Sequence, residues 1–197
     1  MYFFFDCETT GLPRVRYFSP EVADEWPRLV QLAWARYDAR GNAEETRCHI
    51  VRPDGFRIPE ESTRIHGITQ ARALEAGRDL AEVLDEFLAA AGRPGTVLVA
   101  HNLDYDFGVV GAELVRQRKP LRFLDIPGIC TMKSTTELVR LPRPSGGFGF
   151  KWPTLEELHT YVFGFSYEGA HDAARDIEAC ARSFFKLRAA GHYPALR

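Results

Sequence analysis

The sequence has no long apolar run. Its apolar start, Tyr2 to Phe5, is followed at once by Asp6. That stretch is too short for the core of a signal peptide, or for a membrane span of about 20 residues. We therefore expect a soluble, cytoplasmic protein without a membrane partner.

Closely spaced cysteines are also missing. The four cysteines, Cys7, Cys48, Cys130 and Cys180, lie far apart in the chain. Zinc sites and compact disulfide frameworks use close pairs, so this pattern predicts ordinary reduced thiols.

A strong net charge is absent too. The formal net charge is −2 and the sequence pI is about 6.3. The molecule as a whole therefore has no strong attractive field for a phosphate backbone. Nucleic-acid binding would have to be local, and bound cations would help it by neutralising the site.

The chain shows neither an internal repeat nor a domain linker. With 197 residues, of which 45% are hydrophobic, it is long enough for one substantial core and short for two. We predict a single domain over residues 1–197.

Strand patterns dominate the first part of the chain. Three stretches rich in aromatic and branched residues predict strands over residues 2–5, 29–37 and about 45–51. Gly41-Asn42 separates the last two and favours an antiparallel hairpin. The segment from Pro13 to Pro27 has no sustained period, and we interpret it as an ordered loop or insertion.

Helices and strands alternate in the rest of the chain. Asp79 is a candidate N-cap for a helix that ends at Gly92 or just before Pro94. The further elements that we predict are a buried strand over 96–100, a helix to about 118, a strand near 128–131, helices near 133–139 and 154–161, and a last helix over about 172–189. This order predicts an α/β fold with a mixed five-stranded sheet flanked by helices, in which the first three strands are antiparallel and the last two are parallel.

Three groups of residues could take part in catalysis or bind a metal, and the first follows the first strand. Residues two apart in a strand point to the same face, so Asp6 and Glu8 present two carboxylates side by side. Their repulsion would raise one pKa unless a cation lies between them, and oxygen ligands suit Mg²⁺ and Mn²⁺. Acidic residues at strand ends often simply face water, so this pair alone decides nothing.

The second group follows the buried strand. Asp104 and Asp106 come directly after His101-Asn102 and could converge with Asp6 at the edge of the sheet. An alternative is that either aspartate simply favours the first turn of a helix, through capping or the macrodipole.

The third group opens the last helix. His171 and Asp176 would lie about 140° apart in a regular helix, so His171 must precede the helix or stand at its start. A neutral imidazole there could take a proton from an attacking water near physiological pH. The alternatives are that His171 is a surface or capping residue and that Asp172 is only the N-cap.

Taken in order, these groups resemble a known family. Asp6-x-Glu8-Thr9-Thr10-Gly11, His101-Asn102-x-x-Tyr105-Asp106 and His171-x-Ala173-x-x-Asp176 are similar to the three motifs of the DEDDh, or DnaQ-like, exonuclease superfamily. That superfamily includes the proofreading epsilon subunit of DNA polymerase III and ribonuclease T. Residues 27–32 and the segment His66-Gly67-Ile68-Thr69 resemble two further family segments.

The resemblance implies an RNase H-like fold and a 3′-to-5′ exonuclease that uses two divalent cations, Mg²⁺ or Mn²⁺, and releases nucleoside 5′-monophosphates. It implies that Asp6 bridges the cations, that Glu8 and Asp176 hold one of them, and that Asp106 supports the other. His171 is then the general base. The family pattern thereby selects Asp106 over Asp104 and Asp176 over Asp172.

The resemblance also suggests the substrate contacts. The backbone around Thr9 and Thr10 would meet the terminal 3′ hydroxyl, and Leu12 would wedge against the last bases. His66, Asn102 and Phe107 would line the same groove. For Leu12 and Phe107 the alternative is plain core packing.

The chain also departs from the family. Tyr105 stands where the family usually has phenylalanine, and Gln31 stands where many members have glutamate. The segment Arg143 to Trp152 combines glycines with Phe148, Phe150 and Trp152, whose rings offer faces on which bases could stack. The alternative is a flexible loop whose aromatic side chains pack into the core.

The expected substrate is a single-stranded 3′ end, with DNA favoured over RNA. An RNA-trimming or oligoribonucleotide-degrading nuclease is the first alternative, because only contacts to the 2′ hydroxyl distinguish the two sugars. An inactive binding or accessory module is the second, although none of the five expected catalytic residues is replaced. A polymerase partner is not indicated, and the oligomeric state is open, including a homodimer.

Overall fold

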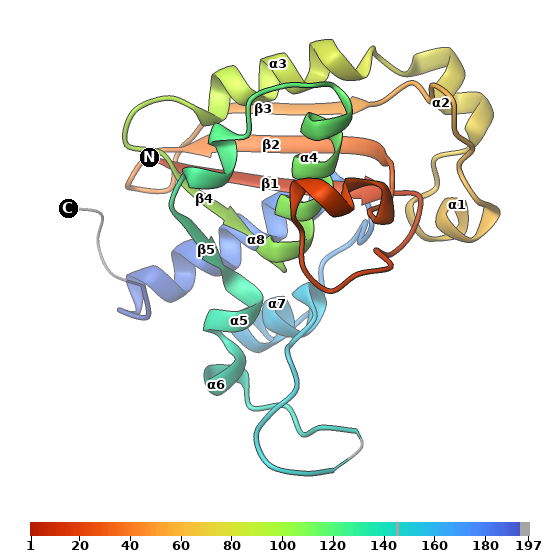
Figure 1. The fold of residues 1–197 in the computed structure, drawn as a ribbon. Helices are drawn as coiled ribbons and strands as arrows, with labels where there is room; N and C mark the ends of the chain where they lie inside the picture. The colour runs from red at the N-terminus through yellow and green to blue at the C-terminus, as the bar shows by residue number, and fades with distance from the viewer. Residues whose placement is uncertain (145, 194–197) are drawn as a thin grey trace.

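The computed structural model describes residues 1–144 and 146–193, and its centre is one mixed sheet (Figure 1). The strands are β1 (Tyr2–Thr9), β2 (Leu29–Tyr37), β3 (Ala43–Ile50), β4 (Val97–Ala100) and β5 (Gly128–Cys130), in the order β3-β2-β1-β4-β5. β1 pairs antiparallel with β2 and parallel with β4; β2 and β3 are antiparallel, and β4 and β5 are parallel. The predicted mixed five-stranded sheet is confirmed.

Helices cover both faces of this sheet (Figure 1). They are α1 (Glu60–His66), α2 (Gln70–Ala76), α3 (Leu80–Ala91), α4 (Leu103–Arg116), α5 (Thr131–Ser134), α6 (Thr136–Val139), α7 (Leu155–Phe163) and α8 (Ala173–Ala189), with 3-10 turns η1 (Pro20–Glu25) and η2 (Arg122–Asp125). No helix in the described part of the chain is both long enough and apolar enough to cross a membrane.

The alternation of β1 decides which helices cover which face. Phe3 and Phe5 pack on one side in the cluster that includes α3 and α4, whereas Tyr2 and Phe4 pack on the other side with α7 and α8. Successive side chains of a strand point to opposite faces, so an unbroken apolar run suits a strand that is covered on both sides. Even-numbered residues of β1 therefore face α8.

Local sequence signals explain several boundaries. Asp79 caps α3 by accepting a hydrogen bond from the Glu82 N–H at 3.1 Å, as predicted. Thr154 and Glu157 cap α7 reciprocally. The Asp38 carboxylate accepts hydrogen bonds from the Asn42 N–H and side-chain amide, which closes the β2–β3 hairpin at the predicted turn.

Other elements differ from the prediction. β1 runs on to Thr9, because β2 continues to pair with it beyond Phe5. The helix predicted near 133–139 is two short helices, α5 and α6. The pattern turns helical after Pro59, but it did not predict α1 and α2 as separate helices before Asp79. The buried residues of α1 are Ser62 and His66, so this helix has no apolar stripe that a periodicity could reveal.

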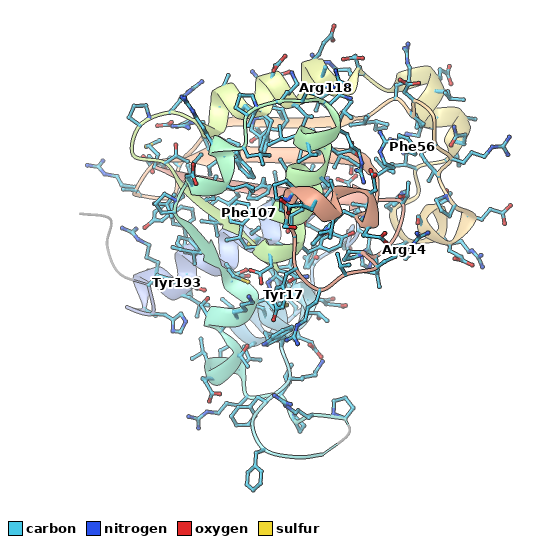
Figure 2. All side chains as sticks on the ribbon, viewed as in Figure 1. Arg14, Tyr17, Phe56, Phe107, Arg118 and Tyr193 are labelled. Atoms are coloured by element: carbon cyan, nitrogen blue, oxygen red, sulfur yellow. The ribbon has the colours of Figure 1, made fainter. Side chains whose placement is uncertain are left out.

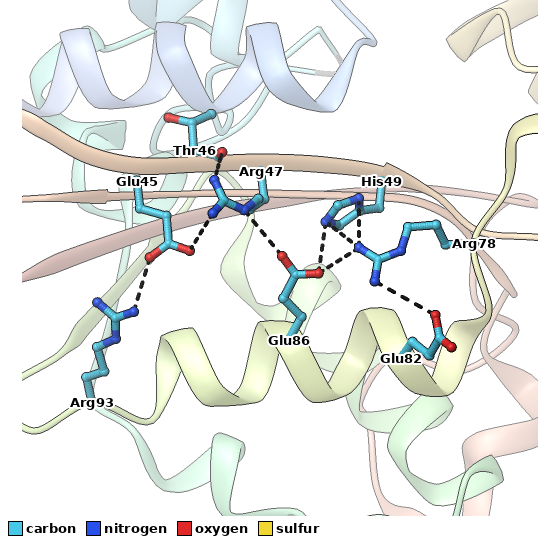
Figure 3. A network of polar contacts seen from close by, with 8 residues as sticks. All are labelled: Glu45, Thr46, Arg47, His49, Arg78, Glu82, Glu86 and Arg93. Atoms are coloured by element: carbon cyan, nitrogen blue, oxygen red, sulfur yellow. Dashed lines mark hydrogen bonds and ion pairs between the residues drawn. The ribbon is translucent and has the colours of Figure 1, made fainter.

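The edge strand β3 is largely exposed and is joined to α3 by ion pairs (Figure 3). Glu86 of α3 contacts Arg78 at 2.7 Å, Arg47 at 3.3 Å and His49 at 3.3 Å. Charged side chains on an edge strand disfavour pairing with other chains. Acidic and basic groups alternate in this network, so its arginines are already neutralised.

Candidate active site

The expected catalytic residues line one cavity of about 370 Å³. It lies where the parallel strands β1 and β4 end, and segments from four distant parts of the chain meet there. Its lining residues are Asp6, Cys7, Glu8, Thr9, Gly11, Leu12, Ser62, Ile65, His66, His101, Asn102, Tyr105, Asp106, His171 and Asp176. We call this the carboxylate cavity.

The second half of strand β1 supplies Asp6 and Glu8. Both have even numbers and continue the face of Tyr2 and Phe4, which is the face that α8 covers. Glu8 is only 8% exposed. Strand alternation therefore directs both carboxylates toward the start of α8.

Asp106 reaches the same place from the first turn of α4. β4 pairs with β1 only as far as Phe4, so later residues of β1 have no strand partner on that edge. The Cys7 N–H instead donates a hydrogen bond to Asp106 Oδ1 at 3.1 Å, and Asp106 is 2% exposed. Asp104, which spacing alone had left open, is exposed and ion-paired to Lys133, outside the cavity.

The start of α8 supplies His171 and Asp176. His171 has a positive φ of 68° and precedes the helix, as the geometry required. Asp172 is the N-cap and accepts a hydrogen bond from the Ala174 N–H. The His171 N–H donates to Asp176 Oδ2 at 3.2 Å, and one possible ligand atom each of Glu8, His171 and Asp176 lies within 4.8 Å of the others.

Burial and mutual repulsion dominate the electrostatics. Burial first, and then the charges of Asp176 and Asp172, raise the pKa of Asp6 well above its ordinary value. Burial and then Asp6 do the same to the pKa of Asp106, and burial with Asp6 raises the pKa of Glu8 to about 9. Burial also raises the pKa of Asp176. Such a set of oxygen donors fits divalent cations, which would relieve the repulsion.

Four of the six expected substrate residues line the carboxylate cavity: Thr9, Leu12, His66 and Asn102. Leu12 is 84% exposed, so core packing does not explain it. Asn102 takes the left-handed conformation just before α4. The His66 ring accepts the Ile68 N–H through Nδ1 at 3.1 Å, which fixes its orientation.

Thr10 and Phe107 lie elsewhere. Thr10 exchanges two hydrogen bonds with the backbone of Arg28, accepting through Oγ1 at 2.9 Å and donating through its N–H at 3.0 Å. Phe107, labelled in Figure 2, is partly buried and packs against the core on Phe5 and Phe123, with ring centroids 6.1 and 5.2 Å away, and it does not line the carboxylate cavity. Phe107 lies there because its neighbours are apolar, so its position agrees with the alternative of core packing and not with a place in the substrate groove.

Several residues with a clear part in the site were not singled out for it. The Tyr105 hydroxyl lies 2.8 Å from the Gly11 carbonyl and 2.6 Å from Thr9 Oγ1, which ties the segment after β1 to α4. Tyr167 donates to Asp176 Oδ1 at 2.6 Å. Gln31 accepts from the Ala173 N–H at 3.2 Å and anchors the start of α8. The departures at Tyr105 and Gln31 were the available signals; Tyr167 had none.

A mixed sheet in this order, with helices on both faces and an acidic cavity at the ends of its central strands, is the RNase H-like architecture of nucleases. A family model described as exonuclease, RNase_T, matches residues 3–184. The chain therefore belongs to this exonuclease family, with DnaQ-like members, and the family generally uses divalent metal ions.

Named relatives agree with this assignment. The chain is 31% identical over 182 residues to the DNA polymerase III subunit epsilon of Aquifex aeolicus, covering 92% of this chain and 77% of the relative. It is 31% identical over 184 residues to DNA polymerase III PolC-type of Streptococcus thermophilus, covering 93% of this chain and 11% of the relative. The match therefore covers only a small part of that polymerase.

Solved structures support the fold. E. coli exonuclease I in complex with a dA16 oligonucleotide superposes with a TM-score of 0.75 at 22% identity, over 95% of this chain and 40% of that one. A zinc-bound complex of the same enzyme with single-stranded DNA gives the same TM-score at 21% identity, with the same coverage of both chains. The present chain thus spans well under half of exonuclease I.

Proposed function

We propose that residues 1–197 form one exonuclease domain that removes nucleotides from single-stranded 3′ ends, DNA in preference to RNA, in a 3′-to-5′ direction. One observation carries the proposal. Asp6, Glu8, Asp106, His171 and Asp176, from three distant segments, line a single cavity. The complexes of exonuclease I with single-stranded DNA, one of them zinc-bound, support the substrate and the need for a metal.

The carboxylates would hold two divalent cations, Mg²⁺ or Mn²⁺. Asp6 would be shared between them, the role that the motif resemblance implies, and it lines the same cavity as both Asp106 and Asp176. Glu8 and Asp176 would complete one position and Asp106 the other. When bound, such a pair polarises the phosphodiester and stabilises its attacking and leaving oxygens.

His171 would be the general base. It lies on the turn before α8, with one ring nitrogen within 4.8 Å of a carboxylate oxygen of Glu8 and of Asp176. The hydrogen bond from its N–H to Asp176 holds this turn against the carboxylates. A neutral imidazole at this position would accept the proton of the attacking water.

The terminal nucleotide would lie among the remaining lining residues. The backbone around Thr9 and Thr10 would meet the 3′ hydroxyl; the Tyr105 hydroxyl holds this segment through the Thr9 side chain and the Gly11 carbonyl. The exposed Leu12 would wedge against the last bases, and His66 and Asn102 would line the sides.

Digestion of end-labelled single- and double-stranded DNA and RNA, with Mg²⁺ or Mn²⁺, tests the proposal. We expect mononucleotides to be released from the 3′ ends of single-stranded DNA fastest, EDTA to stop release, and either metal to restore it. The Asp6→Asn variant should be folded and inactive, and Asp54→Asn, at an exposed aspartate outside the carboxylate cavity, serves as the matched control. Full activity of purified Asp6→Asn, or hydrolysis that persists in thorough chelation, would contradict the metal assignment.

A further inference from the structure

A second cavity, of about 290 Å³, adjoins the carboxylate cavity. Asn102 and Tyr105 line both cavities, so the second begins where the first ends. Its other important lining residues are Arg16, Tyr17, Lys133 and Trp152. We call it the side groove.

Two irregular segments build the side groove together. Tyr17 belongs to the segment between Pro13 and Pro27, and Trp152 belongs to the loop that follows α6. Tyr17 is 67% exposed and Trp152 is 55% exposed, so for both rings core packing is not the reason for their position. Exposed aromatic faces that gather in one groove indicate a ligand with flat, apolar faces of its own.

Positive charge accompanies these rings. The Arg16 guanidinium carbon lies 5.2 Å from the centroid of the Tyr17 ring, and Arg16 has no ion pair within the described residues. Lys133 is paired to Asp104, the acidic residue of the groove, so that pair is neutral and the charge of Arg16 remains. Aromatic faces beside an unneutralised cation are the combination that binds single-stranded nucleic acid.

The neighbouring cavity on the other side of Leu12 lacks this combination. Its cations are already paired: Arg14 with Glu25 at 3.9 Å, and both Arg28 and Arg116 with Glu113. Its one large aromatic residue, Trp26, is buried. The side groove is therefore a better binding site for a nucleic-acid strand than this neighbouring cavity.

We propose that the side groove binds the nucleotides that lie 5′ to the scissile phosphate of a single-stranded end, a proposal that depends on the proposed exonuclease function. Bases stack on Tyr17 and Trp152, and Arg16 contacts a phosphate. The terminal nucleotide occupies the carboxylate cavity, and the rest of the strand leaves past Asn102 and Tyr105.

Steady-state kinetics on two substrates test this. The p-nitrophenyl ester of thymidine 5′-monophosphate contains one nucleotide and does not reach the side groove, whereas dT12 fills it. For Tyr17→Ala and Trp152→Ala we expect KM for dT12 to rise roughly 5- to 150-fold with kcat little changed, the usual effect of losing one stacked base. Hydrolysis of the ester should be unaffected.

Salt dependence tests the phosphate contact. A cation that contacts one phosphate of a single strand contributes about 0.7 to the slope of log affinity against log salt. Arg16→Gln should lower that slope for dT12 by about this amount. Arg118→Gln makes the same charge change far from Tyr17, just beyond the C-terminal end of α4, and should not lower the slope (Figure 2).

Phe148→Ala is the matched aromatic control. Phe148 belongs to the same loop as Trp152 but is fully exposed and does not line the side groove. An unchanged KM for dT12 in Tyr17→Ala and Trp152→Ala, or an equal rise in Phe148→Ala, would overturn the proposal. An equal loss on the ester would do the same, because it would mean a general disturbance of the active site.

Failure of the proposed function gives a different result. If the wild-type protein hydrolyses neither substrate, the proposed DNA exonuclease function is wrong. Binding of fluorescein-labelled dT12, followed by anisotropy with Ca²⁺ present, then still tests the groove without hydrolysis. In this binding assay, equal affinity of the wild-type, Tyr17→Ala and Trp152→Ala proteins for dT12 would reject the proposed role of the side groove.

Discussion

Replacing Glu8 with glutamine should make the metal-free protein more stable at neutral pH while it abolishes activity. Burial, and then the charges of Asp6, Asp176 and Asp172, raise the pKa of Glu8 from 4.5 to about 9. In the unfolded chain this carboxyl ionises from about pH 4.5 upward, whereas the folded protein retains the proton until near pH 9. Its contribution to stability is therefore complete below pH 4.5 and is lost as the pH rises.

The size of the effect follows from that interval. Each pH unit between 4.5 and 7 costs the folded state about 1.4 kcal/mol, so the cost at pH 7 is roughly 3 kcal/mol. Glutamine has no proton to lose and removes this cost. For a domain of this size, the melting temperature of Glu8→Gln should exceed that of the wild type by roughly 6 to 12 °C.

Thermal denaturation in EDTA from pH 4.5 to 8.5 measures the difference. We expect it to be close to zero at pH 4.5, to grow as the pH rises, and to shrink when Mg²⁺ is added to the wild type. Glu86→Gln is the control, because the pKa of Glu86 is shifted in the opposite direction: hydrogen bonding to Arg78 lowers it. The Glu86→Gln variant should therefore gain no stability at pH 7. A Glu8→Gln protein no more stable than the wild type at pH 7 and 8 would refute the reasoning.

Three further substitutions have defined outcomes. His171→Ala should lower kcat by roughly 10² to 10⁴-fold, and an unchanged pH–rate profile would reject His171 as the base. Tyr167→Phe removes the donor to Asp176 Oδ1 and should raise the Mg²⁺ concentration needed for half-maximal activity about tenfold, measured by metal titration; an unaltered titration would mean that the bond is dispensable. Gly108→Ala would place a Cβ 2.1 Å from the Trp26 ring and should cost about 1 to 3 kcal/mol in urea denaturation, whereas a wild-type midpoint would show that Trp26 moves freely.

The parts of the fold that could be predicted are those in which the core imposes a period on the sequence. β1 and β2 are covered on both faces and read as apolar runs, and α3 shows its apolar stripe and its N-cap. α1 buries Ser62 and His66, so nothing in its pattern separates it from a loop. Its contribution of three residues to the carboxylate cavity could not be read from the sequence.

The active site likewise has residues that the sequence predicts and contacts that it does not. Spacing alone could not decide between Asp104 and Asp106; the family resemblance selected Asp106, and the structure places Asp106 in the cavity and Asp104 outside it. Contacts such as Tyr167 with Asp176 depend on how the chain turns before α8, which no short-range pattern encodes. Phe107 is one helical step from Asp106, and that step of about 100° is enough to turn its ring away from the carboxylate cavity and against the core.

α8 has a consequence for how the molecule is made. Asp176 stands on this last helix, and the helix docks through Phe184 on Tyr2 and Phe4 and through the bond between Gln31 and Ala173. A chain still being translated holds Asp6, Glu8 and Asp106 long before it has residue 176. Growing polypeptides should therefore remain harmless to nearby nucleic acid until residue 176 has been made and α8 has docked on the sheet.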